Sequence, residues 1–488
     1  MIFENYSNLG FFNPYYIKNN KLRIYNSFKD ALTENAKKEL DPASFIQIIS
    51  KGYCFGNRTL IKGLFKSPWM AKPSVDMDKW NYFDLPKHHN FILDEVEIAE
   101  KLYLLLEIEL FEYCASKQNI GILLSGGMDS RISTGVLNNL VKKAKISPNI
   151  TALTWGIENS RDVVYAKEIA KRFKWKWEHF ELSSTNLLNN IGIVSEIGCE
   201  VSPIHLHSMP EVRKFKGLDC IIASSFGDSI GRAVYSSRHI SKLSNISKYI
   251  NNWFFLLKDD FFYTYKNEAI LDLIKYRNNY VRDNESQYLE IEQQAHYMRR
   301  MLNPCIGIIN NNITTYQTFS SPAVYGFMWS LAAEKRNDNI YSIIMSKYIN
   351  ELVDIPWSKT GLRYSKKEGS PDNYTKDCTL YHYWINNSLF DYLFSFIESR
   401  GFDDISFFNK KSLIKIIETN RKLTSDKFTR IDEIFVWIVS LLKMIDKYEI
   451  KTITDSKISI KDDFNALLCK PYFLLAERGF HIKEKMKF

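Results

Sequence analysis

The pattern of apolar and polar positions changes character twice along the chain. Between about residues 94 and 224, short apolar runs typical of buried strands alternate with stretches whose apolar residues recur at helical spacing. Strands are expected at 119–124, 150–155, 178–182 and 219–224, and helices at 94–117, 128–143 and 161–173. This alternation predicts an α/β fold with a parallel sheet.

The two flanking regions have different patterns. Residues 1–92 mix short apolar runs, turn-forming residues and aromatics, which predicts a small, shortened N-terminal α+β module. From about residue 245 the periodicity is helical almost throughout, most clearly at 319–333, 339–352, 381–399 and 431–445. We therefore expect two domains: the module at 1–92, and a domain at 93–488 with an α/β core and a helical C-terminal part.

Composition narrows the class of protein. With 488 residues, 45% of them hydrophobic and 25% charged, the chain is of ordinary globular composition, which excludes a disordered or low-complexity protein. The net charge of +9 is a mild excess without a basic tail, so no nucleic-acid partner is expected. Seven cysteines without a Cys-x-x-Cys motif speak against a disulfide scaffold or zinc ribbon. No signal peptide or membrane span is visible, so we expect a cytoplasmic protein without a membrane partner.

The most informative stretch is GILLSGGMDSR at residues 121–131, where a predicted strand ends and a helix begins. At such a junction, free backbone N–H groups and the positive end of a helix dipole point at one spot, which favours an anion. Gly126 and Gly127 have no side chains to keep a phosphate from the backbone, and Ser125 and Ser130 add hydroxyl donors. The stretch therefore indicates a phosphate-binding loop.

An acidic residue beside an anion site needs a cation between them. Mg²⁺ bridging Asp129 and phosphate oxygens would meet this need. No Gly-Lys-Ser/Thr follows the loop, which excludes the ordinary P-loop, and no Gly-x-Gly-x-x-Gly follows a strand. The alternative is a tight turn in which Asp129 merely caps the helix; the apolar residues before the loop and the α/β pattern around it favour nucleotide binding.

The loop resembles the pyrophosphatase loop of ATP-dependent synthetases that release AMP and pyrophosphate. More narrowly, it resembles the synthetase domain of asparagine synthetases and their relatives, the β-lactam synthetases and lasso-peptide cyclases. Three further segments support the narrower resemblance: TALTWGIENSRDVVYAKEIA at 151–170, SSFGDSIGR at 224–232 and IPWSKTGLR at 355–363. The resemblance spans about residues 50–370 and implies a pyrophosphatase-loop core that uses ATP and Mg²⁺.

The resemblance also implies site residues. Asp129 and Asp228, each following a predicted strand, are expected to share Mg²⁺, with a simple turn as the alternative for Asp228. Lys359 is expected to stabilise charge on the leaving pyrophosphate, with Arg363, Lys366 and Lys367 competing for that role. The expected nucleotide-binding residues are Leu124, Ser125, Gly126, Gly127, Asp129, Ser130, Trp155, Gly156 and Gly227. Of these, Trp155 and Gly156 are expected to flank the adenine, although Trp155 could equally be core.

Three other polar features have simpler interpretations. Arg131 is expected to face solvent from its helix, with a phosphate contact as the alternative. His205 and His207 are two positions apart, as metal ligands on one strand face would be, but without a partner cluster a structural role is favoured. The sequence KWKW at 174–177 leads into a strand and is interpreted as framework rather than a nucleic-acid contact.

Two departures from the family bear on the reaction. Glutamine-using members have a nucleophilic Cys directly after the initiator Met, whereas position 2 here is Ile and the first cysteine is Cys54. Glutamine hydrolysis is therefore not expected. In addition, Ser229 follows Asp228 where the family has Glu, and TTYQTFSSP at 314–322 contains no carboxylate, so the general base is not assigned.

The expected function is that of an ATP-dependent, AMP-forming amide ligase. A small-molecule or peptide carboxylate would be activated as an acyl-adenylate and attacked by ammonia or by a substrate amine; an intramolecular amine would make the enzyme a cyclase. One alternative is a pyrophosphatase-loop enzyme that modifies tRNA, against which the modest charge counts. The other is a scaffold that binds nucleotide without turnover.

Overall fold

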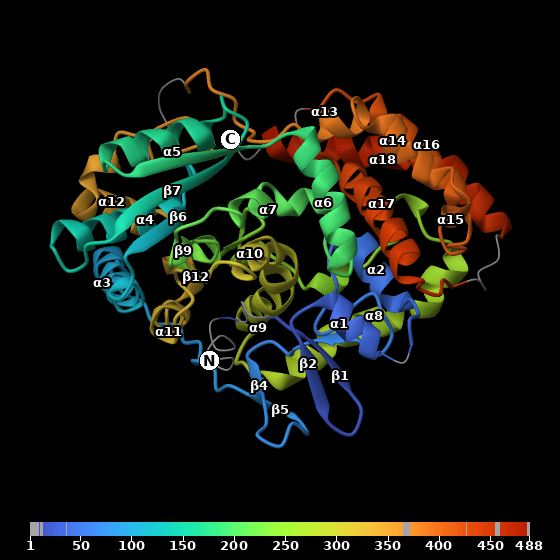
Figure 1. Ribbon diagram of the computed structural model, residues 1–488, viewed down its shortest axis with the longest axis horizontal. Helices are drawn as coiled ribbons and strands as arrows, with labels where there is room; N and C mark the ends of the chain where they lie inside the picture. The colour runs from blue at the N-terminus through green and yellow to red at the C-terminus, as the bar shows by residue number, and fades with distance from the viewer. Residues whose placement is uncertain are drawn as a thin grey trace.

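The central layer is a parallel five-stranded sheet (Figure 1). The computed structural model describes Leu9 and residues 13–35, 37–364, 371–425, 427–453 and 459–485. The strand order is β12-β9-β6-β7-β8, and all four pairings are parallel. The strands are β6 (Asn119–Leu123), β7 (Asn149–Gly156), β8 (Lys176–Glu181), β9 (Cys220–Ala223) and β12 (Thr315–Gln317). The α/β fold and four of these strands are as expected; β12 was not predicted as a strand.

Helices cover both faces of this sheet because successive strand side chains point to opposite sides. Ile120 and Ile122 of β6 belong to the hydrophobic cluster under the first set of helices. That set comprises α3 (Glu95–Cys114), α4 (Met128–Lys142), α5 (Arg161–Arg172), α11 (Pro322–Ser330) and α12 (Asp338–Tyr348). Leu123 points the other way, into a smaller cluster under α7 (Met209–Val212) and α10 (Asn303–Asn310). The sheet is thus buried on both sides and its edges remain for a site.

The N-terminal residues form the expected α+β elements. A three-stranded antiparallel sheet has the order β2-β1-β3. The elements are β1 (Tyr15–Lys18), β2 (Leu22–Tyr25), α1 (Phe28–Glu34), α2 (Pro42–Lys51), β3 (Phe65–Lys66), β4 (Ala71–Pro73) and β5 (Trp80–Tyr82). Phe45 of the buried helix α2 lies 4.6 Å from Phe407 and 6.0 Å from Trp437, measured between ring centroids. This region therefore shares one hydrophobic core with the C-terminal helices, and its boundary at residue 92 stays a prediction.

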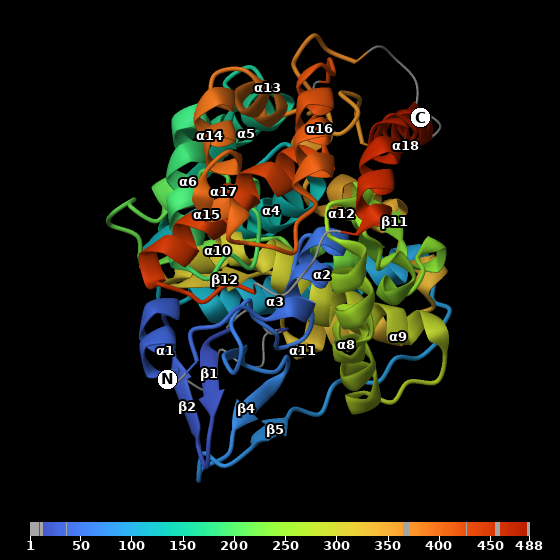
Figure 2. The same cartoon turned by 90° about the vertical axis from the view of Figure 1, so that its right-hand side faces the viewer.

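The C-terminal half is helical, as expected. Besides α10, α11 and α12, it contains α8 (Asp259–Asn279), α9 (Glu285–Glu292), α13 (Tyr381–Asn386), α14 (Phe390–Ile397), α15 (Arg400–Asp403), α16 (Lys410–Arg421), α17 (Arg430–Tyr448) and α18 (Ile460–Lys485). Helix α6 (Ser184–Glu196) precedes this half and contacts α17. The helix expected at 381–399 is divided into α13 and α14, because Asn387 has a non-helical backbone. Helices α13 to α18 gather on one side of the molecule (Figures 1 and 2). Within the described ranges, no helix combines the length and apolar character that a membrane crossing needs.

Candidate active site

The predicted phosphate-binding loop lies between β6 and α4, at the carboxyl edge of the sheet. Leu124 extends β6 by donating its backbone N–H to the Leu153 carbonyl at 2.9 Å. The Ser125 hydroxyl accepts from the Gly127 N–H at 3.1 Å and lies 3.1 Å from the Ser130 hydroxyl. Helix α4 is capped by Gly127 without a side-chain cap, so Asp129 does not play the capping role of the alternative interpretation. The helix N-terminus is therefore left for a ligand.

The two glycines of the loop have different surroundings. A Cβ at Gly126 would lie 2.9 Å from the Ser358 Cβ and 3.0 Å from the Arg161 carbonyl oxygen. At Gly127, the Ser125 hydroxyl at 3.1 Å is the only atom of the described residues, chain neighbours aside, within 4 Å of an added Cβ. Gly126 is thus required by packing, whereas Gly127 faces open space at the helix N-terminus.

This difference predicts that alanine at Gly126 destabilises the protein and that alanine at Gly127 does not. Gly126→Ala is expected to lower the free energy of unfolding by about 1–3 kcal/mol, because its methyl group overlaps backbone that cannot rotate away. Gly127→Ala is expected to stay within about 0.5 kcal/mol of wild type, since a hydroxyl can rotate. Urea unfolding of both proteins tests this, and equal losses in the two would contradict the assignment.

Arg131 is buried, so the expectation that it faces solvent is wrong. Its guanidinium donates to the carbonyls of Ile355 at 2.7 Å, Pro356 at 2.8 Å and Gly126 at 3.2 Å. The Ser358 N–H also donates to the Gly126 carbonyl, at 3.2 Å. Arg131 therefore holds the late basic loop at 355–363 against the phosphate-binding loop. These two loops are more than 200 residues apart in the sequence.

Asp129 and Asp228 come together around a cation that sequence reasoning did not identify. The Arg232 guanidinium donates to Asp129 at 3.3 Å and to Asp228 from the same nitrogen, and its other terminal nitrogen donates to Asp338 at 2.8 Å. Arg232 is only 6% exposed at its side chain, whereas the Asp228 side chain is 47% exposed. One basic residue thus faces three carboxylates, a local excess of negative charge.

The electrostatics of this cluster depend on burial. Burial raises the pKa of Asp129, and the Arg232 charge opposes this shift. Burial alone would lower the pKa of Arg232, but the Asp129 charge and its other neighbours hold it above the usual value. The ionised form of Asp129 therefore depends on positive charge nearby.

The residues fit a shared divalent cation in their chemistry. Asp129 and Asp228 contact one nitrogen of Arg232, so their carboxylates lie close enough to share a cation, and carboxylate oxygens suit Mg²⁺. Across the described part of the chain, no group of three or more His, Cys, Asp or Glu side chains is arranged to hold a metal ion. Further ligands to such an ion would thus be phosphate oxygens or water.

Gly227 makes the approach of the two carboxylates possible. It begins a π-helical turn, Gly227–Gly231, directly after the loop that follows β9. A Cβ at Gly227 would lie 2.5 Å from the Asp129 Cβ, and the Tyr341 hydroxyl donates to the Gly227 carbonyl at 2.9 Å. Only a residue without a side chain fits between α4 and α12 at this position.

Comparison with known families covers the loop itself. Residues 110–211 match the family model described as asparagine synthase. This segment is similar to the asparagine synthase family. The matched segment includes β6, the phosphate-binding loop, β7 and β8, and it supports an ATP-dependent ligase of the asparagine synthetase type. It ends before Asp228 and Lys359, and a search of the curated proteins finds no relative that matches the chain.

Lys359 lies on the late basic loop, next to the aromatic side chain of Trp357. The Lys359 ammonium lies 5.0 Å from the centre of the Trp357 ring, and the Arg232 guanidinium lies 5.9 Å from the same ring. Arg363 is exposed on the same loop, while Lys366 and Lys367 lie outside the described residues. Lys359 and Arg232 thus lie near the same Trp357 ring, and the catalytic role of Lys359 stays a prediction.

Trp155 and Gly156 lie at the carboxyl end of β7, where the expected adenine contact would be. Trp155 is half-buried against the smaller hydrophobic cluster, and its ring centroid lies 6.5 Å from that of His207. Gly156 has a φ of +132°, and an added Cβ would lie 3.0 Å from the Cys378 Cβ. The chain around Cys378 therefore packs tightly on this strand end, and the adenine contact stays a prediction.

The two histidines near this strand have protein partners. His205 lies 2.5 Å from a Glu433 oxygen, and His207 lies 3.2 Å from the Tyr381 hydroxyl. Burial lowers the pKa of His207 to about 4. Both side chains therefore have structural contacts, in line with the structural role favoured from the sequence.

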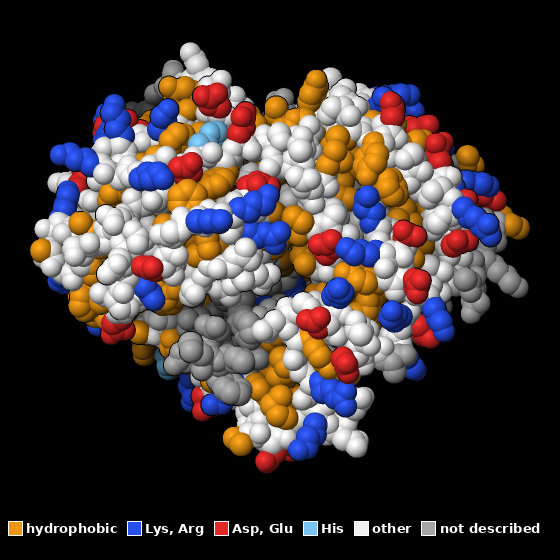
Figure 3. Space-filling view, viewed as in Figure 1, with side chains coloured by type: hydrophobic (Ala, Val, Ile, Leu, Met, Phe, Trp, Pro, Cys, Tyr) orange, Lys and Arg blue, Asp and Glu red, His pale blue; other side chains and the backbone are white. Residues whose placement is uncertain are grey.

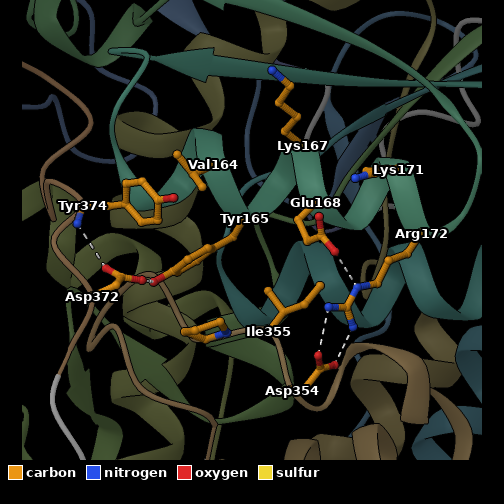
Figure 4. Close-up of a pocket in the computed structure, with 11 residues that line it drawn as sticks. Val164, Tyr165, Lys167, Glu168, Lys171, Arg172, Asp354, Ile355, Asp372 and Tyr374 are labelled. Carbon is orange, nitrogen blue, oxygen red and sulfur yellow. Dashed lines mark hydrogen bonds and ion pairs between the residues drawn. The ribbon is translucent and has the colours of Figure 1, made fainter.

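A separate cavity of about 470 Å³ lies on the outer side of α5 (Figure 4). Figure 4 shows Arg172 joined to both Glu168 and Asp354 along its wall, and Tyr165 bonded to Asp372. None of the predicted site residues lines this cavity. Its ion pairs fasten α5 to the segment that precedes the late basic loop.

Proposed function

We propose that the protein is an AMP-forming amide ligase that activates a carboxylate with ATP. The observation that carries this proposal is the meeting of Asp129, from the phosphate-binding loop, with Asp228 at the same edge of the sheet. The carboxyl edge of a parallel sheet is where α/β proteins bind nucleotides. Residues 93–488 would form the synthetase domain, and residues 1–92 a module without a glutaminase nucleophile.

In this proposal, different residues of the site bind the phosphates, hold Mg²⁺ and stabilise the leaving group. Backbone N–H groups at the start of α4 would bind phosphate oxygens, with Gly127 allowing close approach and Gly126 allowing the loop to pack against Ser358. Asp129 and Asp228 would hold Mg²⁺, which when bound offsets the charge of the polyphosphate. Lys359 would stabilise negative charge on the leaving pyrophosphate from the loop that Arg131 fastens in place.

The reaction has two steps. A carboxylate oxygen attacks the α-phosphorus of ATP, which forms an acyl-adenylate and releases pyrophosphate. A nitrogen nucleophile then attacks the acyl carbon, which forms the amide and releases AMP. The nitrogen would come from ammonia or from an amine on the substrate, and an amine on the same molecule would give a cyclic product.

A scaffold that binds nucleotide without turnover is the second candidate. The observation in its favour is that Arg232 already serves both carboxylates expected to hold the metal. If Arg232 satisfies them permanently, the site would bind nucleotide but would not support adenylation.

Pyrophosphate release with Mg²⁺-ATP, ammonium and a panel of carboxylic acids and short peptides separates the two candidates. The ligase is expected to release pyrophosphate with at least one acid, and Gly127→Val is expected to lose both Mg²⁺-ATP affinity and release. Calorimetry supplies the affinity, and Gly192→Val, a helical glycine with no atom near its added Cβ, serves as the matched control. ATP binding without any release would favour the scaffold, and unchanged ATP affinity in folded Gly127→Val would refute the loop assignment.

A further inference from the structure

A cleft of about 880 Å³ is lined by residues other than those of the proposed nucleotide site. Its walls come from the N-terminal segment around β1 and α1, the end of α6, the π-helix Gln293–Leu302, α10 and the end of α17. These elements surround the middle of the view in Figure 1, where the surface in Figure 3 is hollowed. Its volume lies in the range of small-molecule sites. None of its lining residues is among those predicted for ATP.

Helix α10 separates this cleft from the sheet. Ile306 and Ile309 belong to the hydrophobic cluster on the sheet, whereas Asn303, Gly307 and Asn310 line the cleft. The spacing of these last three places them on one helical face. Among the described residues, leaving aside its chain neighbours and its own helix backbone, no atom lies within 4 Å of a Cβ added at Gly307, so the cleft is open there toward the described residues.

Two cations in the cleft wall form no direct ion pair with a carboxylate among the residues that the structure describes, although the Glu200 charge acts on Lys66. Arg299 is 1% exposed and donates only to neutral oxygens, among them the Tyr276 hydroxyl at 2.9 Å and Asn13 Oδ1 at 2.7 Å. The Lys66 ammonium lies 3.3 Å from the centre of the Tyr15 ring. Burial lowers the pKa of Lys66 to about 8. Because buried charges in proteins are normally paired, these two favour an anion.

The same wall contains buried polar atoms without hydrogen-bond partners. Both amide atoms of Asn303, which is 4% exposed, lack a partner, as does Oε1 of Glu200. The other Glu200 oxygen pairs with Arg300 at 2.5 Å. Such unpaired atoms are rare in native proteins, and small side-chain rotations of the kind common on binding would bring them onto a ligand.

We propose that this cleft binds a ligand that carries both a carboxylate and an N–H donor, as a free amino acid or an acidic peptide end does. The carboxylate would lie near Lys66 and Arg299, and the N–H group would donate to Glu200 Oε1. The Asn303 amide can both donate to and accept from an amide group. Glu200 disfavours a simple phosphate, because its free oxygen offers no donor.

Calorimetric titration of the full chain without ATP tests this inference. The probes are L-glutamate, N-acetylglycyl-L-glutamate, succinate and inorganic phosphate. One of the first two is expected to bind at least about tenfold more tightly than succinate and phosphate, which lack the N–H donor. The better of the first two identifies the source as a free amino acid or a peptide. Binding of neither, or equal affinity for succinate, would overturn the proposal.

Two variants locate the binding. Lys66→Gln is expected to weaken the better probe about tenfold or more, because it removes a partly desolvated charge. Gly307→Leu fills the open part of the cleft and is expected to abolish binding. Gly192→Leu in α6, where an added Cβ also has no atom within 4 Å, is the matched control and should bind as wild type does. Unchanged affinity in both folded test variants would place the probe elsewhere and refute the cleft as its site.

Discussion

Asp129→Asn and Asp228→Asn proteins are expected to release pyrophosphate about a hundredfold or more slowly than wild type, with little change in melting temperature. Each substitution removes a carboxylate that the proposed function assigns to Mg²⁺, and charge stabilisation of this kind commonly contributes that much to a rate. The fold should persist, because Arg232 keeps two of its three carboxylate partners in either variant. The measurements are pyrophosphate release with an accepted acid and thermal unfolding.

The double variant tests whether the two carboxylates act together. Residues that act as a unit give non-additive losses, so the double variant should be little slower than the worse single one. Asp391→Asn, whose side chain is 94% exposed far along the chain on α14, is the control and should retain activity. Near-normal release by Asp228→Asn would remove that residue from the site.

The sheet was predictable wherever a strand has its own apolar run. β6, β7 and β9 coincide with apolar runs visible in the sequence, whereas β8, Lys-Trp-Glu-His-Phe-Glu, has no such run and overlaps the strand expected at 178–182. β12 consists of Thr-Tyr-Gln, three residues whose extended form depends on parallel pairing with β9 rather than on their own pattern. Such a short polar strand at a sheet edge has no local periodicity to identify it.

The chemistry-bearing loop was predictable, but the residues that fasten it were not. Arg131 follows a pattern that would suit an exposed helical arginine, and its burial depends on carbonyls at 355 and 356. Arg232 stands in the segment recognised for Asp228, yet nothing local indicates that it meets Asp338 from 106 residues further on. The spacing of residues along the chain cannot reveal long-range partners of this kind. Gly126 and Gly127, in contrast, can be recognised from the residues directly around them.

Beneath the site, a second charged cluster is expected to contribute strongly to stability. Glu290 and Arg336 form a bidentate pair with two contacts of 2.7 Å, and each side chain is only 2% exposed. His88 lies 3.2 Å from the same carboxylate, and the Tyr235 hydroxyl donates to it at 3.1 Å. The pair therefore joins four segments that are distant in the sequence.

Arg336→Met is expected to lower the free energy of unfolding by about 3–5 kcal/mol at neutral pH, because it leaves the Glu290 charge buried without its partner. Arg172→Met, which breaks partly exposed pairs with Glu168 and Asp354, is the control and should lose no more than about 1 kcal/mol.

Burial alone would raise the pKa of Glu290, but the Arg336 charge and the His88 hydrogen bond outweigh it and hold that pKa well below its usual value. The stability that this carboxylate contributes in wild type is therefore present above the ordinary glutamate pKa of about 4.3 and declines as the pH falls below it. The deficit of Arg336→Met should consequently shrink in acid, where its Glu290 can be protonated. Urea unfolding at neutral pH and near pH 3–4, about the ordinary glutamate pKa, measures both effects. If Arg336→Met and Arg172→Met lost the same free energy of unfolding at neutral pH, the buried pair would contribute no more than a surface pair.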